Sequence, residues 1–287
     1  MAKNLTKVAF IYDFDETLST TYMQDYILIP ALGDRPDHFW KTANQWSKDN
    51  CADQITGTMY YIQHSAKEKG IKLTKQFLCD TAKNITYFDG VEQWFDRINE
   101  YGAKLGLQVE HYIISSGMEE IISGTSIRKH FKDVFGCSYV YNDEGIPIWP
   151  ARIVNYSTKT QYIAKINKGL SKTEDRAVNE YMPDDQRRIP YKRMIYFGDG
   201  ITDIPCMTFV KKQGGVSIAL YPKGKKNKVT NLLLDNRVNY ICSADYQEGS
   251  DLDSLVKCII QEMKLSHTLQ LKQKQQRSRE SKKIETK

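Results

Sequence analysis

Short apolar runs rich in β-branched and aromatic residues recur along the chain, and each ends in polar or acidic residues. The first, Val8–Tyr12, leads directly into Asp-Phe-Asp. Four similar runs follow, at residues 109–115, 193–197, 216–220 and 238–242. Amphipathic segments lie at residues 91–104, 118–130, 159–168 and 252–264. Strands that alternate with helices predict an α/β fold, in which a parallel sheet is covered by helices on both faces.

One long stretch, residues 19–87, breaks this alternation. It is rich in helix formers and aromatic residues and contains no convincing strand. The sequence therefore predicts three parts: an α/β core formed by residues 1–18 and 88–264, a helical cap inserted at residues 19–87, and a flexible basic tail at 265–287. The tail has few apolar residues to bury, so we expect it to be disordered or a frayed helix.

Composition agrees with a folded chain that has a sizeable core. Of the 287 residues, 40% are apolar and 26% are charged. The net charge of +6 is concentrated at the C-terminus, where residues 264–287 hold eight Lys or Arg residues against two Glu. The rest of the chain is close to neutral. The basic isoelectric point is therefore only weak evidence for a nucleic-acid partner, and we do not expect one.

The cysteines and the N-terminus bear on the compartment. Six cysteines are scattered along the chain with no CxxC pair, so neither a zinc site nor a disulfide framework is expected. This pattern is typical of a reducing compartment. The first apolar run is too short for a signal peptide, and no stretch approaches the roughly 20 apolar residues that span a bilayer. We expect a cytoplasmic protein without a membrane partner; the sequence predicts no oligomeric state.

Acidic residues follow two of the predicted strands. Asp13 and Asp15 follow the first strand, and Asp199 and Asp203 follow the strand at 193–197. Taken separately, the first pair is equally well explained as a polar turn, and one Asp of the second pair as a helix cap. Together, two pairs of carboxylates at the carboxyl edge of one parallel sheet predict an oxygen-lined site of the kind that Mg²⁺ prefers.

Two further elements indicate a functional role only when they are considered together with these carboxylates. Ser115 ends the strand at 109–115 and is followed by Ser116 and Gly117. Hydroxyl and backbone N–H groups at such a turn bind phosphate oxygens, although a plain N-cap for the next helix explains them equally well. Lys159 begins a predicted helix and by itself reads as a surface charge. The lysines at 223–228 are interpreted as a solvated loop.

These elements in this order resemble the haloacid-dehalogenase (HAD) superfamily. Its opening motif DxDx[TV] appears here as DFDET, followed by the strand-end Ser115, then Lys159, then an acidic pair in GDGITD. The resemblance covers Val8 to Cys242. It extends to the phosphoserine-phosphatase group, because IISSGM resembles that group's VSGGF turn and GDGITDIPCM its GDGxND element. The resemblance implies a Rossmann-like parallel sheet core with an inserted helical cap.

The resemblance also implies roles for the residues. Asp13 would be the nucleophile and a Mg²⁺ ligand, the carbonyl of Phe14 a second ligand, and Asp199 a third. Asp15 would protonate the leaving oxygen and then activate water without binding the metal directly, while Asp203 would support the metal site from behind the ligands. The residues that would bind the transferring phosphoryl group are Ser115, Ser116 and Lys159.

The function implied is Mg²⁺-dependent hydrolysis of a small phosphorylated metabolite through a phospho-aspartyl intermediate. The same core also fits a phosphotransferase or a phosphonate hydrolase, and a non-catalytic binding scaffold is a further alternative. A dehalogenase is disfavoured by Asp15 and the second acidic pair. Phosphoserine phosphatases hold the substrate's amino group with a Glu, and by count from Asp13 that position here is Tyr22. We therefore expect a substrate without a buried ammonium group.

Overall fold

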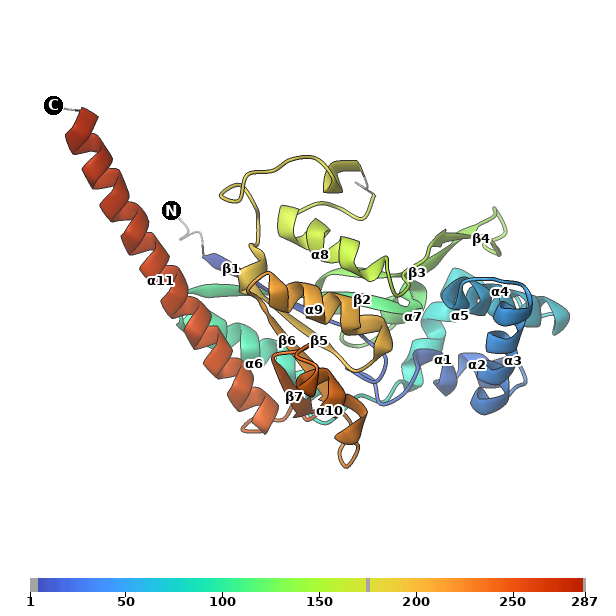
Figure 1. Cartoon of the computed structure of the whole chain (residues 1–287). Helices are drawn as coiled ribbons and strands as arrows, with labels where there is room; N and C mark the ends of the chain where they lie inside the picture. The colour runs from blue at the N-terminus through green and yellow to red at the C-terminus, as the bar shows by residue number, and fades with distance from the viewer. Residues whose placement is uncertain (1–4, 174–175, 286–287) are drawn as a thin grey trace.

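The computed structural model describes residues 5–173 and 176–285, and it is built on one seven-stranded sheet (Figure 1). The strand order is β4-β3-β2-β1-β5-β6-β7. The strands are β1 (Thr6–Tyr12), β2 (Leu107–Met118), β3 (Phe131–Tyr141), β4 (Pro147–Arg152), β5 (Met194–Gly198), β6 (Val216–Tyr221) and β7 (Tyr240–Ser243). All neighbours pair in parallel except β3 and β4. The predicted α/β fold with a parallel sheet core is confirmed.

The central strand β1 is buried because its side chains are apolar on both faces of the sheet. Its last residue, Tyr12, pairs with Ile113 of β2 on one side and with Phe197 of β5 on the other. The rings of Tyr12 and Phe197 stack with 4.7 Å between their centroids. This register brings the carboxyl ends of β1, β2 and β5 together at one edge of the sheet.

Helices cover both faces of the sheet (Figure 1). On one face lie α8 (Lys159–Lys168) and α9 (Ile204–Lys212), and on the other lie α6 (Val91–Lys104) and α11 (Asp251–Glu285). A shorter helix, α10 (Asn227–Leu234), packs near β6 and β7. The bounds of α6 and α8 are those predicted from hydrophobic periodicity.

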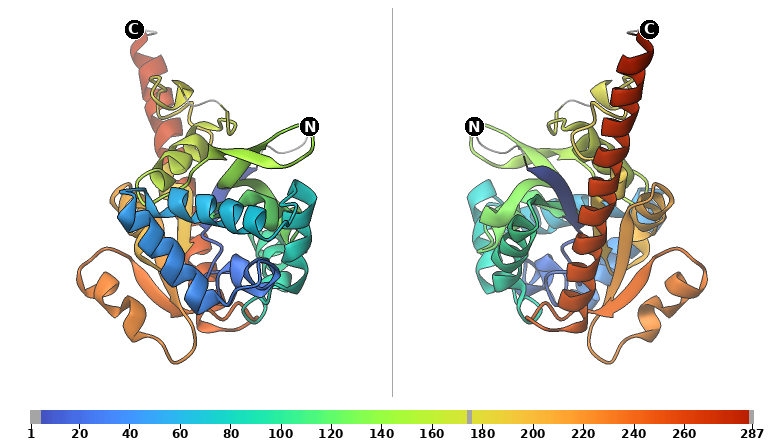
Figure 2. Two further views of the ribbon diagram at one scale, coloured as in Figure 1. Left: turned by 90° about the vertical axis from the view of Figure 1, so that its right-hand side faces the viewer. Right: turned by 90° about the vertical axis from the view of Figure 1, so that its left-hand side faces the viewer.

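The insert after β1 is helical and lies at the end of the sheet where β1 ends (Figures 1 and 2). It contains α1 (Met23–Tyr26), α2 (Leu28–Ala31), α3 (Pro36–Asp49), α4 (Gln54–Glu68), α5 (Lys75–Asp80) and a 3-10 turn at Thr81–Asn84. Ser19 and Tyr87 face each other in an isolated antiparallel bridge, so the chain leaves and re-enters the core at one place.

Local sequence explains where the cap helices begin. Pro36 occupies the first turn of α3, where its missing N–H costs nothing. The Asp53 side chain accepts hydrogen bonds from the N–H groups of Ile55 and Thr56 and caps α4. The two long helices cross closely at Gly57, because a Cβ there would lie 2.0 Å from the Ser47 hydroxyl oxygen.

The region after β2 differs from the prediction. Instead of one helix over 118–130 there is a short helix, α7 (Glu119–Ser123), and a 3-10 turn at Arg128–His130. Helix α7 ends at Gly124, whose Cα lies against the backbone of Cys79 with no space for a side chain. The hairpin β3–β4 was not predicted, because its second strand carries Pro147 and Pro150, and prolines are confined to edge strands such as this one.

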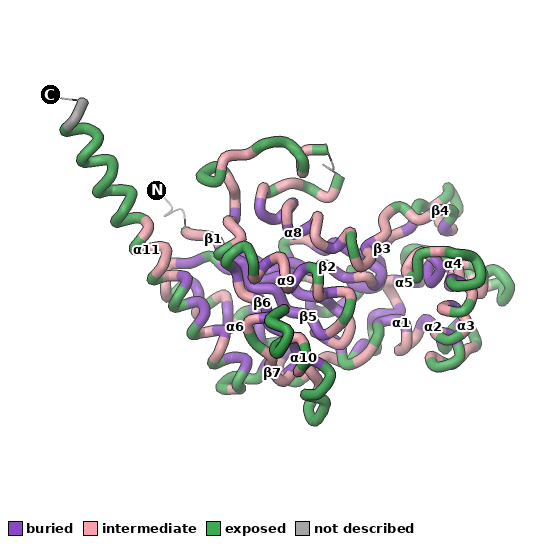
Figure 3. Tube along the Cα trace, in the orientation of Figure 1, coloured by how far each residue is buried: buried purple, intermediate pink, exposed green. Residues whose placement is uncertain are grey.

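The C-terminal segment also differs from the prediction. Helix α11 continues through residues 265–285 rather than ending near 264, and it extends beyond the core on the side away from the cap (Figure 1). Its last half contains Lys, Gln, Arg and Glu and neither Gly nor Pro, which favours helix continuation. Residues 271–283 are exposed (Figure 3), whereas His267 Nε2 lies 2.8 Å from the Thr6 hydroxyl oxygen. The region between 265 and 270 therefore contacts the core through His267, although Leu265 and Leu269 are exposed.

Among the described residues, none of the helices combines the length and the apolar character that crossing a membrane requires.

Candidate active site

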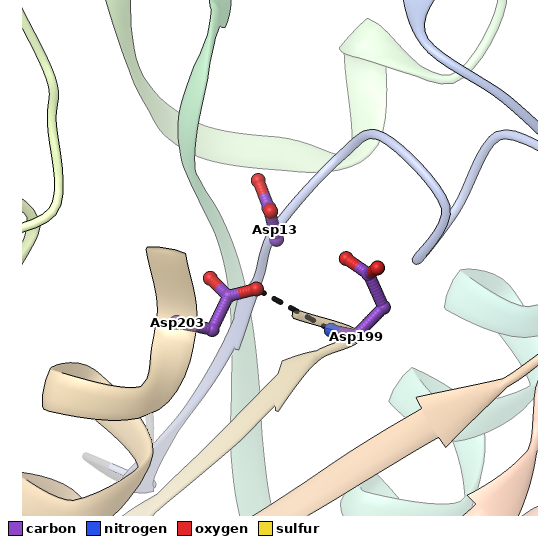
Figure 4. Close-up of side chains that lie close together, drawn as sticks. All are labelled: Asp13, Asp199 and Asp203. Atoms are coloured by element: carbon purple, nitrogen blue, oxygen red, sulfur yellow. Dashed lines mark hydrogen bonds between the residues drawn. The ribbon is translucent and has the colours of Figure 1, made fainter. Parts of the chain in front are cut away.

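Three carboxylates meet where β1 and β5 end (Figure 4). Asp13 follows β1 directly, Asp199 follows β5, and Asp203 lies at the start of α9. One oxygen from each of the three lies within 4.8 Å of the others. All three residues are buried. The sequence predicted that two acidic strand ends would meet at one edge of the sheet, and the structure brings them together there.

Lys159 lies between two of these carboxylates. Its Nζ is 3.0 Å from Asp13 Oδ2 and 2.8 Å from Asp203 Oδ1, and the side chain is fully buried. Burial opposes the charged ammonium form, but Asp13 and Asp203 outweigh that effect and raise the pKa of Lys159 above its ordinary value. The lysine is thus a fixed positive charge directly behind the Asp13 carboxylate.

Asp203 has its hydrogen-bonding capacity largely filled by the protein. Its Oδ1 also accepts from the Tyr196 hydroxyl at 2.7 Å, and its Oδ2 accepts from the N–H groups of Asp199 and Gly200 at 3.3 and 3.4 Å. The carboxylate therefore holds both Lys159 and the loop that carries Asp199. A buried carboxylate with four hydrogen-bonding partners acts as a rigid support for the site.

Asp13 is oriented by the backbone on its other side. Its own N–H donates to the Phe197 carbonyl at 2.9 Å, and its Oδ1 accepts from the Phe14 N–H at 2.7 Å. Burial, followed by repulsion from Asp203, raises the pKa of Asp13 well above its ordinary value, although Lys159 opposes the shift. Any further positive charge nearby would therefore stabilise the ionised form of Asp13.

Asp15 is held by the cap. Its Oδ1 accepts a hydrogen bond from the N–H of Met23, the first residue of α1, at 2.8 Å. Burial raises the pKa of Asp15 to about 8, and this hydrogen bond only partly opposes the shift. Gly117 permits the approach of the two segments, because a Cβ at that position would lie 2.1 Å from Met23 Cε and 3.1 Å from Asp15 Oδ2.

Lys228 is a site residue that the sequence interpretation missed. Its Nζ lies 2.6 Å from Asp199 Oδ2 and 2.9 Å from Glu16 Oε2. Burial and repulsion from Asp203 raise the pKa of Asp199 to about 6, while Lys228 opposes that shift. The residue was assigned to a solvated loop, because nothing in the local pattern indicates that α10 turns this one lysine toward β1 and β5.

The two predicted serines occupy different positions. Ser115 is fully buried, and its hydroxyl oxygen accepts from the Gly117 N–H at 3.0 Å. Ser116 lines the cavity described below, and within the described part of the chain its buried hydroxyl has no hydrogen-bond partner. The Ser116 hydroxyl is therefore free to donate to a ligand and to accept from it, and the Ser115 hydroxyl, which only accepts from Gly117, keeps its own hydrogen free to donate.

The Phe14 carbonyl, which the resemblance implies is a metal ligand, is engaged by the turn that follows it. This oxygen accepts hydrogen bonds from the N–H groups of Leu18 and Ser19 at 2.9 and 3.1 Å, so its two lone pairs are occupied by the turn that follows. The next carbonyl along the chain, that of Asp15, accepts no hydrogen bond from any residue that the structure describes, and its oxygen is available to a ligand.

A cavity of about 590 Å³ separates the strand ends from the cap. Asp13, Asp15 and Asp199 lie at its floor, and residues of α1, α3 and α4 form its opposite wall. Most of that wall is apolar or neutral, with Trp40, Ile55, Met59 and Ile62 among its members. Hairpin β3–β4 supports the cap, because the Tyr139 hydroxyl donates to the Met59 carbonyl at 2.5 Å.

The donor set fits a hard divalent cation. Its groups are carboxylate oxygens, which Mg²⁺ prefers to nitrogen or sulfur. The acidic residues at the floor outnumber the two lysines beside them; they are Asp13, Asp15, Glu16, Asp199 and Asp203. Burial is the main cause of the raised pKa values of Asp13, Asp15 and Asp199, and repulsion between neighbouring carboxylates adds to it, so the excess of negative charge is unfavourable. A bound cation would remove it.

Comparison with known proteins defines the class of fold. No protein-family model matches the chain. It is 28% identical over 273 residues to an uncharacterized protein of Borreliella burgdorferi, with 85% of this chain and 93% of the relative covered. A HAD family hydrolase of Salmonella enterica serovar Typhi superposes with a TM-score of 0.56 and 16% identity over 90% of this chain and 72% of that one.

Two phosphoserine-phosphatase structures are also similar. One, a phosphoserine phosphatase in its apo form, has a TM-score of 0.53 and 16% identity over 88% of this chain and 98% of that one. The other, a phosphoserine phosphohydrolase-like protein of Francisella tularensis, has a TM-score of 0.51 and 18% identity over 82% and 94%. The chain therefore has the HAD hydrolase fold, in the form seen in the phosphoserine-phosphatase-like group, as its motifs predicted.

Proposed function

We propose that this protein is a Mg²⁺-dependent phosphatase that hydrolyses a small phosphomonoester through a phospho-aspartyl intermediate on Asp13. The observation that carries the proposal is the position of Asp13. Its carboxylate lies at the floor of the cavity, fixed by Lys159 at 3.0 Å and by the Phe14 N–H at 2.7 Å, beside a cluster of oxygen ligands. Phosphoryl transfer depends on such alignment and charge neutralisation.

Each residue then has a defined part. An Asp13 oxygen forms a bond to phosphorus as the ester bond breaks, and Asp15 gives its proton to the departing alcohol oxygen. Asp15 next takes a proton from water, whose oxygen attacks the phosphoryl group and releases Asp13 and inorganic phosphate. Lys159 balances negative charge on Asp13 throughout. The Ser115 and Ser116 hydroxyl groups donate to phosphoryl oxygens, and Ser115 also accepts from the Gly117 N–H that shapes the turn.

Mg²⁺ would be held by Asp13, Asp199 and the carbonyl of Asp15, and Asp203 would support these ligands without binding the cation. When bound, the cation supplies positive charge that screens the approach of two anions. Asp203 keeps Asp199 in place through its bonds to the N–H groups of Asp199 and Gly200.

The cap limits the size of the substrate. A cavity of about 590 Å³ under α1, α3 and α4 admits a small phosphorylated metabolite and excludes a folded phosphoprotein. Tyr22, at the position expected to recognise an amino group, is 44% exposed and packs on Trp40 with 5.2 Å between ring centroids. A tyrosine supplies no counter-charge, so we expect free phosphoserine to be a poor substrate.

The test is a measurement of phosphate release from p-nitrophenyl phosphate with Mg²⁺ and with EDTA. The proposal predicts turnover that EDTA abolishes, and covalent phosphate on the peptide that holds Asp13 after an acid quench. Full activity in EDTA would contradict the metal requirement. Transfer of the phosphoryl group to added glycerol in preference to water would favour the phosphotransferase instead.

A further inference from the structure

The charged residues that line the cavity are confined to its floor. Among the described residues that line it, the charged ones are Asp13, Asp15, Glu16 and Asp199, which follow strand ends, and Lys228 of α10, which is paired with two of them. Lys228 is already paired with Asp199 and Glu16. Asp25, the acidic residue of α1, accepts instead from Trp40 Nε1 at 2.8 Å and from the Thr21 hydroxyl at 2.9 Å. An ammonium or carboxylate on the alcohol part of a substrate would therefore be buried against this wall without an opposite charge.

Most polar groups on the cap side of the cavity are already bonded to one another. The Tyr156 hydroxyl donates to Gln54 Oε1 at 2.5 Å, and Gln54 Nε2 donates to Asn44 Oδ1 at 2.8 Å. The Thr58 hydroxyl donates to the Gln54 carbonyl at 2.9 Å. These bonds tie α4 to α3 and to the segment that carries Tyr156, and they leave the bonded atoms little capacity for a ligand.

Gln24 is different. Its side chain lines the cavity and is only 5% exposed, yet within the described part of the chain its Oε1 has no hydrogen-bond partner. A buried acceptor without a donor is unfavourable, and such groups are uncommon in folded proteins. The unfilled position points to a ligand that brings the missing donor.

The backbone places Gln24 next to the predicted acid. Gln24 directly follows Met23, whose N–H donates to Asp15 Oδ1 at 2.8 Å. In the proposed mechanism Asp15 protonates the ester oxygen, so the atoms that follow this oxygen in the substrate lie beside α1. Gln24 therefore lies on the cap helix that holds Asp15, and its side chain lines the cavity on the cap side, opposite the strand ends that would bind the phosphoryl group.

We propose that Gln24 is a specificity-determining residue that selects an uncharged alcohol part bearing a hydroxyl group, such as a polyol or sugar phosphate. A hydroxyl both donates and accepts, so it satisfies the amide in either of its two orientations. The apolar members of the wall, Trp40, Ile55 and Met59, contact the carbon skeleton. This inference rests on the proposed phosphatase function.

The test uses three substrates that differ in one terminal group: 2-hydroxyethyl, n-propyl and 2-aminoethyl phosphate. For the wild-type protein with Mg²⁺ we expect kcat/KM to be about tenfold higher for the hydroxyethyl than for the propyl ester, as one hydrogen bond to a buried acceptor implies. The aminoethyl ester should be the poorest. Gln24→Met should remove the preference for hydroxyethyl over propyl, and Gln24→Glu should raise the aminoethyl ester relative to the other two.

A matched control is Gln45→Met, the same substitution on the exposed face of α3. It should leave all three ratios unchanged. Gln24→Met should also melt no lower than the wild type, because it removes an unpartnered buried acceptor. Equal use of hydroxyethyl and propyl esters by the wild type, or an unchanged ratio in folded Gln24→Met, would overturn the inference. Failure of the wild type to hydrolyse p-nitrophenyl phosphate would instead reject the proposed function, and this inference with it.

Discussion

Lys228 donates to Asp199 with 2.6 Å between Nζ and Oδ2, and the same ammonium group lies 2.9 Å from Glu16 Oε2. The backbone at Glu16 has a φ of 53°, a left-handed conformation that is unfavourable for a residue with a side chain. The pairing thus joins α10 to the turn after β1 through a residue in a strained conformation. It also places a lysine on a carboxylate that is proposed to bind Mg²⁺.

This pairing predicts a competition between Lys228 and the cation. In Lys228→Met the Asp199 carboxylate is free and the site is more negative, so the dissociation constant for Mg²⁺ should fall by roughly three- to tenfold, because the lysine side chain is 32% exposed and its charge is partly screened. Isothermal titration of the metal-free protein with Mg²⁺ measures this directly. Lys225→Met, which changes an exposed lysine just before α10, is the control and should leave the affinity unchanged. Weaker binding in Lys228→Met would show that the lysine organises the metal site rather than competing for it.

Asp13 and Asp203 should respond differently to the same isosteric change. Asp13→Asn should lower phosphatase turnover by roughly 10³-fold or more, because it removes the proposed nucleophile. In EDTA it should melt at or above the wild-type temperature, since repulsion among the buried carboxylates is reduced. Asp203→Asn should melt lower, because Lys159, Tyr196 and two backbone N–H groups lose a charged acceptor. Retained turnover in folded Asp13→Asn would exclude the phospho-aspartyl mechanism.

His111 predicts a pH dependence of stability that is independent of the metal site. Its imidazole is buried, with Nδ1 3.1 Å from the Tyr12 hydroxyl and Nε2 3.1 Å from Asn99 Oδ1. Burial, together with His130, lowers the pKa of His111 from 6.5 to about 3. Between these values the unfolded chain binds a proton that the native chain does not. This residue therefore makes the free energy of unfolding fall by about 1.4 kcal/mol per pH unit as the pH drops below 6.5.

Urea unfolding of wild type and His111→Gln at pH 7, 6 and 5 isolates this contribution. The wild type should lose more stability across the range than the variant, although the variant starts lower because it disturbs a buried network. His64→Gln, an exposed histidine of α4, should keep the wild-type slope. Identical slopes for wild type and His111→Gln would mean that the pKa of His111 is the same in the native and the unfolded chain.

Some of the site followed from local sequence and some did not. Asp13 and Asp199 were predicted because each directly follows an apolar strand, and parallel strands bring their carboxyl ends to one edge. Lys159 was found only through the resemblance to HAD proteins, since a lysine at a helix start has no local signal of burial. Lys228 was missed for the same reason: its role depends on how α10 packs, which no short window of sequence encodes.

The fold, like the site, was predicted from local sequence in some parts and not in others. Periodicity gave the bounds of α6 and α8 because each presents one apolar stripe to the sheet. The β3–β4 hairpin was missed because Gly136 and two prolines interrupt its pattern, although an edge strand tolerates them. The length of α11 was underestimated because an absence of apolar residues was taken to predict disorder or a frayed helix, while helix propensity alone continues a helix that is already anchored.

The C-terminal helix provides the last prediction, because burial changes sharply along it. Ile259, Ile260 and Met263 are buried against the core, whereas residues 271–283 are exposed. Ending the chain after Gln270 should leave the melting temperature and turnover unchanged, because the part removed buries little. Ending it after Lys264 removes the His267 contact with Thr6 and should lower the free energy of unfolding by about 1 kcal/mol.

Ending the chain after Cys258 should have a far larger effect, because it removes three buried apolar side chains that together stabilise the core by several kcal/mol. Thermal unfolding of the three truncated proteins, followed by circular dichroism, gives the order directly. If ending the chain after Gln270 lowers the melting temperature as much as ending it after Cys258, the exposed half of α11 must pack against something in solution. A second copy of the chain would then be the first candidate, and dependence of the wild-type melting temperature on protein concentration would identify it.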